Sequence, residues 1–234
     1  METVAAVQMK QVTKRFGEVV ANDAVDFELR RGEILSLLGE NGSGKTTLMK
    51  IIAGLMSADS GDICIDGEPL CTRDKARICF MPTENYFYSY MTARDAGKYY
   101  ADFFRDFDRD EYAKLIDRAQ IDMRQKIRTL SSGQSAKLRL SLALARDARI
   151  TMFDEPINGV DVLTCDWVMD EIAQRRRDDR IILMSTHLVH QAEAVTNRAM
   201  CLRNGALVRD ERVANVNLED MYREVFGGRS DAQC

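Results

Sequence analysis

The sequence predicts an α/β protein in which a mostly parallel sheet carries an antiparallel β edge and an inserted group of helices. In the second half of the chain, short apolar runs that suit buried strands alternate with helical patterns, which is typical of a parallel sheet. Near the amino end, residues 4–12 and 24–29 alternate between apolar and polar side chains, which predicts strands of an antiparallel edge sheet. Between about 92 and 147 the pattern is helical and interrupts the strand–helix alternation.

Local patterns place the individual elements. The run Ile34-Leu35-Ser36-Leu37-Leu38 is short and apolar enough for a buried strand, and the stretch 48–53 has the apolar face of a helix. Further strands are predicted at 63–65, 77–81, 150–153 and 181–184, and two more flank the hairpin-type turn Asn204-Gly205. Further helices are predicted at 162–176, 188–195 and 217–226, and the helical stretch contains one apolar face made by Tyr100, Phe103, Phe104 and Phe107. We therefore expect a single domain over 1–234, with 1–83 and 148–234 as the α/β core and 84–147 as a helical subdomain.

Composition excludes several classes of protein. Of the 234 residues, 45% are hydrophobic and 30% are charged, as in a soluble globular protein. Lys and Arg number 33 against 37 Asp and Glu, and this net charge of -4 gives no reason to expect a nucleic acid as partner. No apolar run approaches the roughly 18 residues of a membrane helix, and we expect no secretion signal at the amino end. The six cysteines form no C-x-x-C pair, so we expect reduced thiols in a cytosolic protein.

A phosphate-binding loop follows the strand predicted at 34–38. It reads Gly39-Glu40-Asn41-Gly42-Ser43-Gly44-Lys45-Thr46, a full G-x-x-x-x-G-K-T motif between a strand and a helix. The glycines let backbone N–H groups turn toward a triphosphate, and the helix N-terminus adds partial positive charge. Lys45 is expected to reach the β- and γ-phosphates and the Thr46 hydroxyl to bind Mg²⁺.

Two carboxylates close the strand predicted at 150–153. Asp154 stands where the carboxyl end of a parallel strand meets the phosphate loop, so we expect it to hold Mg²⁺ or its waters. Glu155 comes next and is placed to polarise an attacking water. Without a phosphate loop, the same pair would be an ordinary loop start.

Three further segments narrow the family. Leu130-Ser131-Ser132-Gly133-Gln134 opens a helix upstream of Asp154, Ile157-Asn158-Gly159-Val160-Asp161 follows Pro156, and Met184-Ser185-Thr186-His187 ends the next strand. In this order and spacing the chain resembles the ATP-binding cassette (ABC) ATPases, from Phe16 to the C-terminal helix. The Leu-Ser-x-Gly-Gln element is the specific one, because other P-loop ATPases lack it. The resemblance implies a P-loop NTPase fold, ATP hydrolysis, and ATP and Mg²⁺ as ligands.

The resemblance also implies roles within one subunit. Phe16 would stack on adenine, with a core position near a strand end as the alternative. Thr47 would join the contacts to the α-phosphate. Glu155 would be the catalytic base, and His187 would contact the γ-phosphate and help to place the water.

Other roles would involve a second subunit, since two cassettes of this family pair head to tail. Ser131, Gly133 and Gln134 would contact the γ-phosphate of the ATP on the other subunit, and Asp161 would signal between subunits. A simpler role for Ser131 or Ser132 is an N-cap, and both roles can coexist.

The sequence departs from the family pattern at Thr83. The family usually has Gln at this position, where it touches Mg²⁺ and leads to the partner. Either Thr83 or the adjacent Glu84 would take over the metal contact. Ser132 replaces the commoner Gly of the Leu-Ser-x-Gly-Gln element, and a residue this small is expected to keep the element functional.

An aromatic segment follows Thr83. Tyr86, Tyr88 and Tyr90 lack a helical period, and exposed aromatic side chains favour a binding surface. In ABC transporters this region receives a helix of the membrane subunit, so we expect these tyrosines to line that groove, with local packing as the alternative.

The function predicted from the resemblance is that of the ATPase subunit of a membrane transporter. The stretch from Tyr90 to Asp95 resembles exporters of drugs, peptides or antimicrobial compounds. The expected partners are an integral membrane permease and a second ABC ATPase subunit, identical or paralogous, and the expected location is cytoplasmic, on the inner face of the membrane. The alternatives are a soluble ABC ATPase of translation or DNA repair and, less compatible with the motifs, a small-molecule kinase.

Overall fold

The computed structural model describes residues 6–227. Residues 1–5 and 228–234 lie outside the described part, and with them Cys234 and the first two residues of the strand predicted at 4–12. Among the described residues, no helix is long and apolar enough to cross a membrane.

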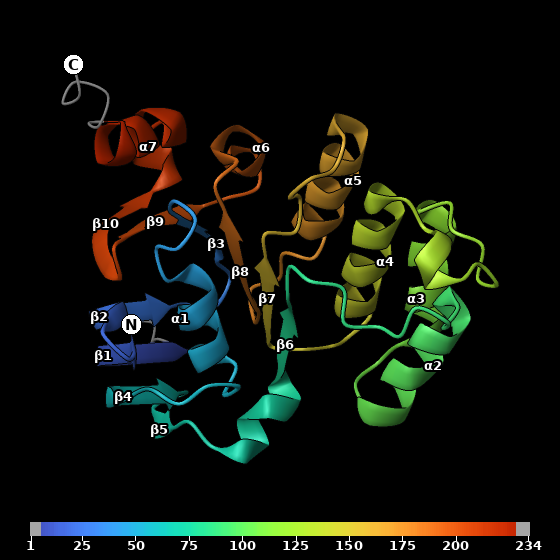
Figure 1. The fold of residues 1–234 in the computed structure, drawn as a ribbon, viewed down its shortest axis with the longest axis horizontal. Helices are drawn as coiled ribbons and strands as arrows, with labels where there is room; N and C mark the ends of the chain where they lie inside the picture. Colours follow the sequence, from blue (N-terminus) through green and yellow to red (C-terminus); the bar gives the residue numbers. More distant parts are fainter. Residues whose placement is uncertain (1–5, 228–234) are drawn as a thin grey trace.

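The main sheet has six strands, in the order β10-β9-β3-β8-β7-β6 (Figure 1). They are β3 (Ile34–Leu38), β6 (Ile78–Met81), β7 (Ile150–Asp154), β8 (Ile181–Thr186), β9 (Arg198–Arg203) and β10 (Ala206–Arg212). All neighbours are parallel except β9 and β10, which form an antiparallel hairpin. The carboxyl ends of β3, β7 and β8 therefore meet at one edge, where open α/β sheets bind their ligands.

The second sheet is antiparallel, in the order β2-β1-β4-β5. Its strands are β1 (Val7–Phe16), β2 (Val19–Leu29), β4 (Ser60–Ile65) and β5 (Glu68–Pro69). Helix α1 (Lys45–Ile52) lies near this sheet in Figure 1. One buried cluster contains Leu48 and Ile51 of α1, Leu35 and Leu37 of β3, and Phe27 of β2, so α1 is fixed between the two sheets.

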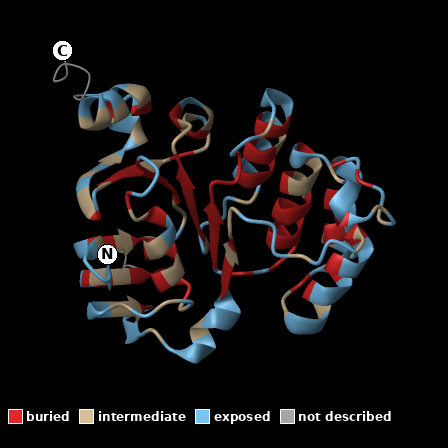
Figure 2. Cartoon of the chain, in the orientation of Figure 1, coloured by how far each residue is buried: buried red, intermediate tan, exposed pale blue. Residues whose placement is uncertain are grey.

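The remaining helices pack outside this centre. They are α2 (Ala93–Phe103), α3 (Arg109–Arg118), α4 (Ser132–Leu144), α5 (Val162–Ala173), α6 (Val189–Glu193) and α7 (Leu218–Phe226). Helices α2, α3 and α4 stand together beyond β6, and α7 lies near the opposite edge of the main sheet (Figure 1). The strands of the main sheet are buried except at β10, whereas the outer faces of α2 and α3 are exposed (Figure 2).

The P-loop fold predicted from the sequence is confirmed. Every predicted strand and helix has a counterpart, and the segment 84–147 contains α2, α3 and α4. The division at 84 and 147 into two subdomains stays a prediction. The predicted aromatic face is wrong at Phe103, which is 67% exposed, whereas Tyr100 and Phe107 are buried.

Candidate nucleotide site

The phosphate loop joins β3 to α1 and rests against β2. Gly44 adopts a φ of 104°, and a Cβ there would lie 2.1 Å from the carbonyl oxygen of Ala21. At Gly39 a Cβ would come within 2.5 Å of the carbonyl oxygen of Leu202. Both positions therefore require glycine, because any side chain would push the loop away from the strands that support it.

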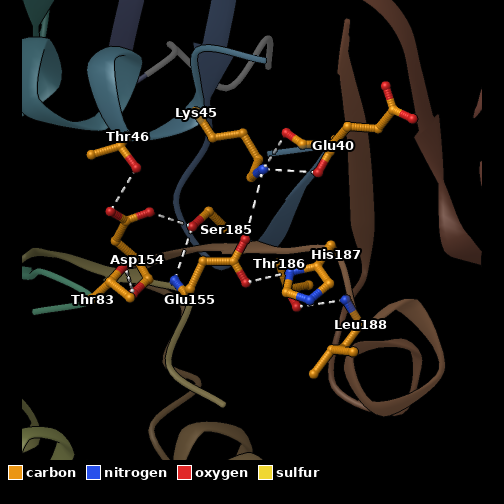
Figure 3. A network of polar contacts seen from close by, with 11 residues as sticks. Glu40, Lys45, Thr46, Thr83, Asp154, Glu155, Ser185, Thr186, His187 and Leu188 are labelled. Atoms are coloured by element: carbon orange, nitrogen blue, oxygen red, sulfur yellow. Dashed lines mark hydrogen bonds and ion pairs between the residues drawn. The ribbon is translucent and has the colours of Figure 1, made fainter. Parts of the chain in front are cut away.

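Lys45 curls back over this loop. Its Nζ donates to the carbonyl oxygens of Gly39 at 2.8 Å and Glu40 at 3.0 Å, and it lies 3.7 Å from Oε1 of Glu155 (Figure 3). Burial lowers the pKa of the Lys45 ammonium, and the nearby carboxylates of Glu155 and Asp154 oppose this shift. The loop thus holds a buried cation beside two carboxylates.

Asp154 is held from both sides. Its Oδ2 accepts a hydrogen bond from the Thr46 hydroxyl at 2.8 Å, and its Oδ1 accepts one from the Ser185 hydroxyl at 2.6 Å. Asp154 and Ser185 are register partners on β7 and β8. Asp154 is 2% exposed, and its carboxylate faces Thr46 in the first turn of α1.

Glu155 turns toward His187 immediately after β7. Its φ of 49° is left-handed, and its N–H donates to the carbonyl oxygen of Ser185 at 3.2 Å and to the Ser185 hydroxyl at 3.0 Å. Glu155 Oε2 and His187 Nδ1 are joined by a hydrogen bond of 2.9 Å, while Glu155 Oε1 is buried without a hydrogen-bond partner. The predicted base and the predicted γ-phosphate contact are therefore direct neighbours.

The site fits a nucleotide triphosphate with Mg²⁺. The Thr46 hydroxyl and Asp154 Oδ2 are close enough to share one cation. Two buried oxygen atoms of the site have no hydrogen-bond partner. They are Ser43 Oγ in the phosphate loop and Glu155 Oε1. Within residues 6–227 no group of three or more His, Cys, Asp or Glu could hold a metal ion. Mg²⁺ is usually bound by one or two protein groups together with substrate phosphates.

The segment after β6 is fastened to the same place. The Thr83 hydroxyl donates to the main-chain carbonyl oxygen of Asp154 at 3.0 Å. The carbonyl oxygens of Pro82 and Thr83 accept hydrogen bonds from Nη1 of Arg139 on α4. The Thr83 hydroxyl thus uses its proton on the backbone at the end of β7, and the metal contact of Thr83 or Glu84 stays a prediction. Glu84 is exposed.

The Leu-Ser-x-Gly-Gln element begins α4. Ser131 and Gln134 form a capping box, each side chain bonding the other's backbone N–H at 3.1 Å, so the predicted N-cap role of Ser131 is confirmed. A Cβ on Gly133 would lie 2.7 Å from Oγ1 of Thr164 and 3.2 Å from Oδ2 of Asp161, the N-cap of α5. Figure 1 places α4 beyond β7 and β6, away from α1 of the same chain.

The other predicted contacts differ in how far they are exposed. Phe16, at the end of β1, is 49% exposed. The alternative that Phe16 is a core residue is therefore wrong, and its ring is available for stacking. Asn41 and Gly42 are exposed, and Thr47 is half-buried on α1. The sequence-based prediction missed Ser185, although a hydroxyl at the carboxyl end of a buried strand beside Asp154 was a usable signal.

Comparison with known proteins places the chain in a family. A family model described as ABC transporter matches residues 22–158, more than half of the chain. The ABC transporter ATP-binding protein YtrB of Bacillus subtilis is 33% identical over an aligned length of 208 residues, and the alignment covers 86% of this chain and 70% of YtrB. The ribose import ATP-binding protein RbsA of Chromobacterium violaceum is 28% identical over an aligned length of 235 residues, and the alignment covers 94% of this chain but 47% of RbsA. This chain therefore spans about half the length of that relative.

Solved structures share the fold. A dimeric ATP-binding cassette, MJ0796, solved in a post-hydrolysis state with ADP and Pi, matches with a TM-score of 0.78 at 24% identity, covering 88% of this chain and 98% of the cassette. The family match, the similarity to YtrB and the geometry around Lys45 and Asp154 agree. The chain belongs to the ABC transporter family and is an ATP-binding, ATP-hydrolysing domain of that family.

Proposed function

We propose that Glu155 is the general base of ATP hydrolysis in this chain. The observation that carries this role is the meeting of Glu155, Lys45 and His187 at the carboxyl ends of β3, β7 and β8. Glu155 Oε1 is buried without a hydrogen bond and can accept one from a water molecule. The bond from Oε2 to His187 fixes the orientation of the carboxylate.

The other site residues divide binding from chemistry. Lys45 and the backbone N–H groups of the phosphate loop would bind the phosphates, and Phe16 would stack on the adenine. Thr46 and Asp154 would hold Mg²⁺, which, when bound, offsets the negative charge of the β- and γ-phosphates. His187 would orient Glu155 and approach the γ-phosphate.

A Glu155→Gln variant tests the role of Glu155. The amide keeps the size of the side chain but cannot accept a proton, so turnover should fall at least a hundredfold, while ATP binding persists. Because the ATP is then not consumed, the variant should also accumulate as an ATP-bound dimer in size-exclusion chromatography. Phosphate release at the wild-type rate would exclude Glu155 as the base.

The dimer would be a head-to-tail pair. Ser131 is exposed at the start of α4, on a part of the chain remote from its own phosphate loop. Ser131, Gly133 and Gln134 would then complete the site of a second cassette, and the exposed Asp161 would lie at the same interface.

The chain would act as the ATPase subunit of a membrane transporter, on the inner face of the membrane. Tyr88 and Tyr90 are 64% and 68% exposed, and their rings stack with centroids 5.4 Å apart. Such a pair of exposed rings suits an apolar anchor of a membrane partner. Tyr86 differs, because its hydroxyl is bonded to that of Tyr100, so packing accounts for part of its role.

Affinity capture from detergent-solubilised native membranes, with ATP present, tests the transporter role. A multi-span membrane protein should be captured at stoichiometric yield, and Tyr88→Ala should reduce this yield without lowering basal ATPase activity. Val208→Ala, at an exposed apolar position on β10, is the control that should leave the yield unchanged. Recovery of the chain only with ribosomes or DNA would favour the soluble alternative.

Export remains part of this proposal because of the resemblance of the stretch from Tyr90 to Asp95. The relative RbsA is named for import, so the similarity does not by itself favour export. Transport by the chain reconstituted with the captured membrane subunit decides the direction.

A further inference from the structure

Ser185 is a buried hydroxyl that contacts both carboxylate residues of the site. It lies on β8, fully buried, directly beside the end of β7. Its Oγ donates to Oδ1 of Asp154 at 2.6 Å and accepts from the backbone N–H of Glu155 at 3.0 Å (Figure 3). One side chain thus uses its donor on the predicted metal ligand and an acceptor lone pair on the predicted base.

The contact with Asp154 completes the fixation of that carboxylate. Thr46 already donates to Oδ2, and Ser185 donates to the other oxygen. Two donors from different elements, α1 and β8, define the plane of the carboxylate. Partners of this kind orient a ligand for its metal.

The contact with Glu155 supports an uncommon backbone conformation. A φ of 49° is rarely adopted by residues other than glycine, and it persists only where surrounding groups stabilise it. The Glu155 N–H is shared between the carbonyl oxygen and the hydroxyl of Ser185. This turn directs the Glu155 carboxylate toward His187 and Lys45.

We propose that Ser185 is a positioning residue whose hydroxyl sets the orientation of the Asp154 carboxylate and of the Glu155 backbone together. The inference rests on the roles proposed above for Asp154 and Glu155. It adds that these two groups are aligned by one hydrogen-bonding atom, so that metal binding and base placement depend on the same hydroxyl.

The test compares Ser185→Ala, which removes the hydroxyl, with Ser185→Thr, which keeps one. ATP affinity is measured with a fluorescent ATP analogue, in EDTA and again with Mg²⁺, and kcat and KM are measured for hydrolysis. In Ser185→Ala the affinity in EDTA should stay within about twofold of wild type, and the gain in affinity on adding Mg²⁺ should fall about tenfold. The kcat should fall about 10–100-fold, and Ser185→Thr should recover most of both losses.

Ser36→Ala is the matched control. Ser36 is also a fully buried strand serine, and its hydroxyl bonds the Thr196 hydroxyl at 2.6 Å, away from the carboxylates. This variant should keep the wild-type Mg²⁺ gain and kcat. Equal losses in Ser36→Ala and Ser185→Ala would show a purely structural effect and overturn the inference, as would wild-type kcat and Mg²⁺ gain in Ser185→Ala.

Two further comparisons keep the test decisive. If Ser185→Ala does not fold, Ser185→Thr is compared with Ser185→Val, because valine has the shape of threonine without the hydroxyl. An equal gain in ATP affinity on adding Mg²⁺ in these two variants would overturn the inference. Glu155→Gln is run in parallel. Full activity of Glu155→Gln would refute the proposed base, whereas loss of its activity with a fully active Ser185→Ala would refute the role of Ser185 alone.

Discussion

Among the glycines of the described chain, Gly44 is the one where an added Cβ would come closest to another atom. Two effects act against a side chain there, since its φ of 104° is left-handed and a Cβ would lie 2.1 Å from the carbonyl oxygen of Ala21. Gly67 shares only the first effect, because its φ is 84° but nothing lies within 4 Å of an added Cβ. Comparison of the two positions separates backbone strain from steric overlap.

We expect Gly44→Ala to lower the free energy of unfolding by about 4 kcal/mol, the range of severe single substitutions. Gly67→Ala should lower it by about 1–2 kcal/mol, the typical penalty of a left-handed residue with a Cβ. Urea denaturation of both variants measures the difference. Equal losses would mean that the loop moves away from β2 without penalty, contrary to the close contact in the structure.

Motif spacing predicted which residues meet beside the phosphate loop but not how they are held. Lys45, Thr46, Asp154, Glu155 and His187 do lie together, because the strands that carry them end at one edge of the sheet. The contacts of Ser185 depend on the register of β7 against β8, which motif spacing does not define, although its place at the carboxyl end of a buried strand was a usable signal. The engagement of the Thr83 hydroxyl by the carbonyl oxygen of Asp154 was unpredictable for the same reason.

Among the elements, the strands buried on both faces were the most predictable. β3 occupies the predicted range, and β7 and β8 extend their predicted ranges by one and two residues, because an uninterrupted apolar run suits a central parallel strand. β1 and β2 are longer than predicted. Their pairing shifts register between Met9 and Val12 and again near Lys14, and these irregularities break the alternation on which the prediction relied.

The helical segment shows a second limit of sequence patterns. Tyr100, Phe103, Phe104 and Phe107 have helical spacing, but α2 ends at Phe103 and Asp108 caps the next helix. Phe107 therefore reaches the core from a connection, while Phe103 packs on Tyr99 at the surface. The predicted burial holds for Tyr100 and Phe107 and in part for Phe104, but aromatic spacing could not define where the helix ends.

Across the whole molecule, arginines join the helical segment 84–147 to the rest of the chain. Arg146, at the end of α4, donates to the carbonyl oxygen of Ile78 and to Asp106, with its guanidinium over the Phe104 ring. Arg118 of α3 forms a bidentate pair with Glu171 of α5. Both of these cations have a carboxylate partner.

Arg139 differs from these arginines. It is 8% exposed, burial lowers the pKa of its guanidinium, and its Nε is buried without a hydrogen bond. Among residues 6–227 no ion pair of Arg139 is formed, and its bonds go to the carbonyl oxygens of Pro82 and Thr83. Because Thr83 is in turn bonded to Asp154, Arg139 connects the helix that begins at Ser132 with the end of β7.

We predict that Arg139→Met frees the segment 83–90 from α4. Losing the bonds to two carbonyl groups should destabilise the molecule by about 1–3 kcal/mol, whereas removing a buried charge without a carboxylate partner acts in the opposite direction. The net change in global stability should therefore be small. Within the segment 83–90, by contrast, the lost hydrogen bonds can only destabilise. Amide hydrogen exchange in 83–90 should therefore accelerate about tenfold or more, which corresponds to a loss of at least about 1.4 kcal/mol in the free energy of local opening.

Hydrogen exchange followed by mass spectrometry measures this effect, with Arg124→Met as the control. Arg124 is an exposed arginine of the same helical segment, so its substitution should leave exchange in 83–90 unchanged. Unchanged exchange in Arg139→Met would mean that Thr83 and the aromatic packing hold the segment without Arg139. Faster exchange in Arg139→Met, both in 83–90 and at the start of α4, would show that Arg139 joins these two segments. One of them carries Tyr88 and the other Ser131, which are proposed to contact different partners.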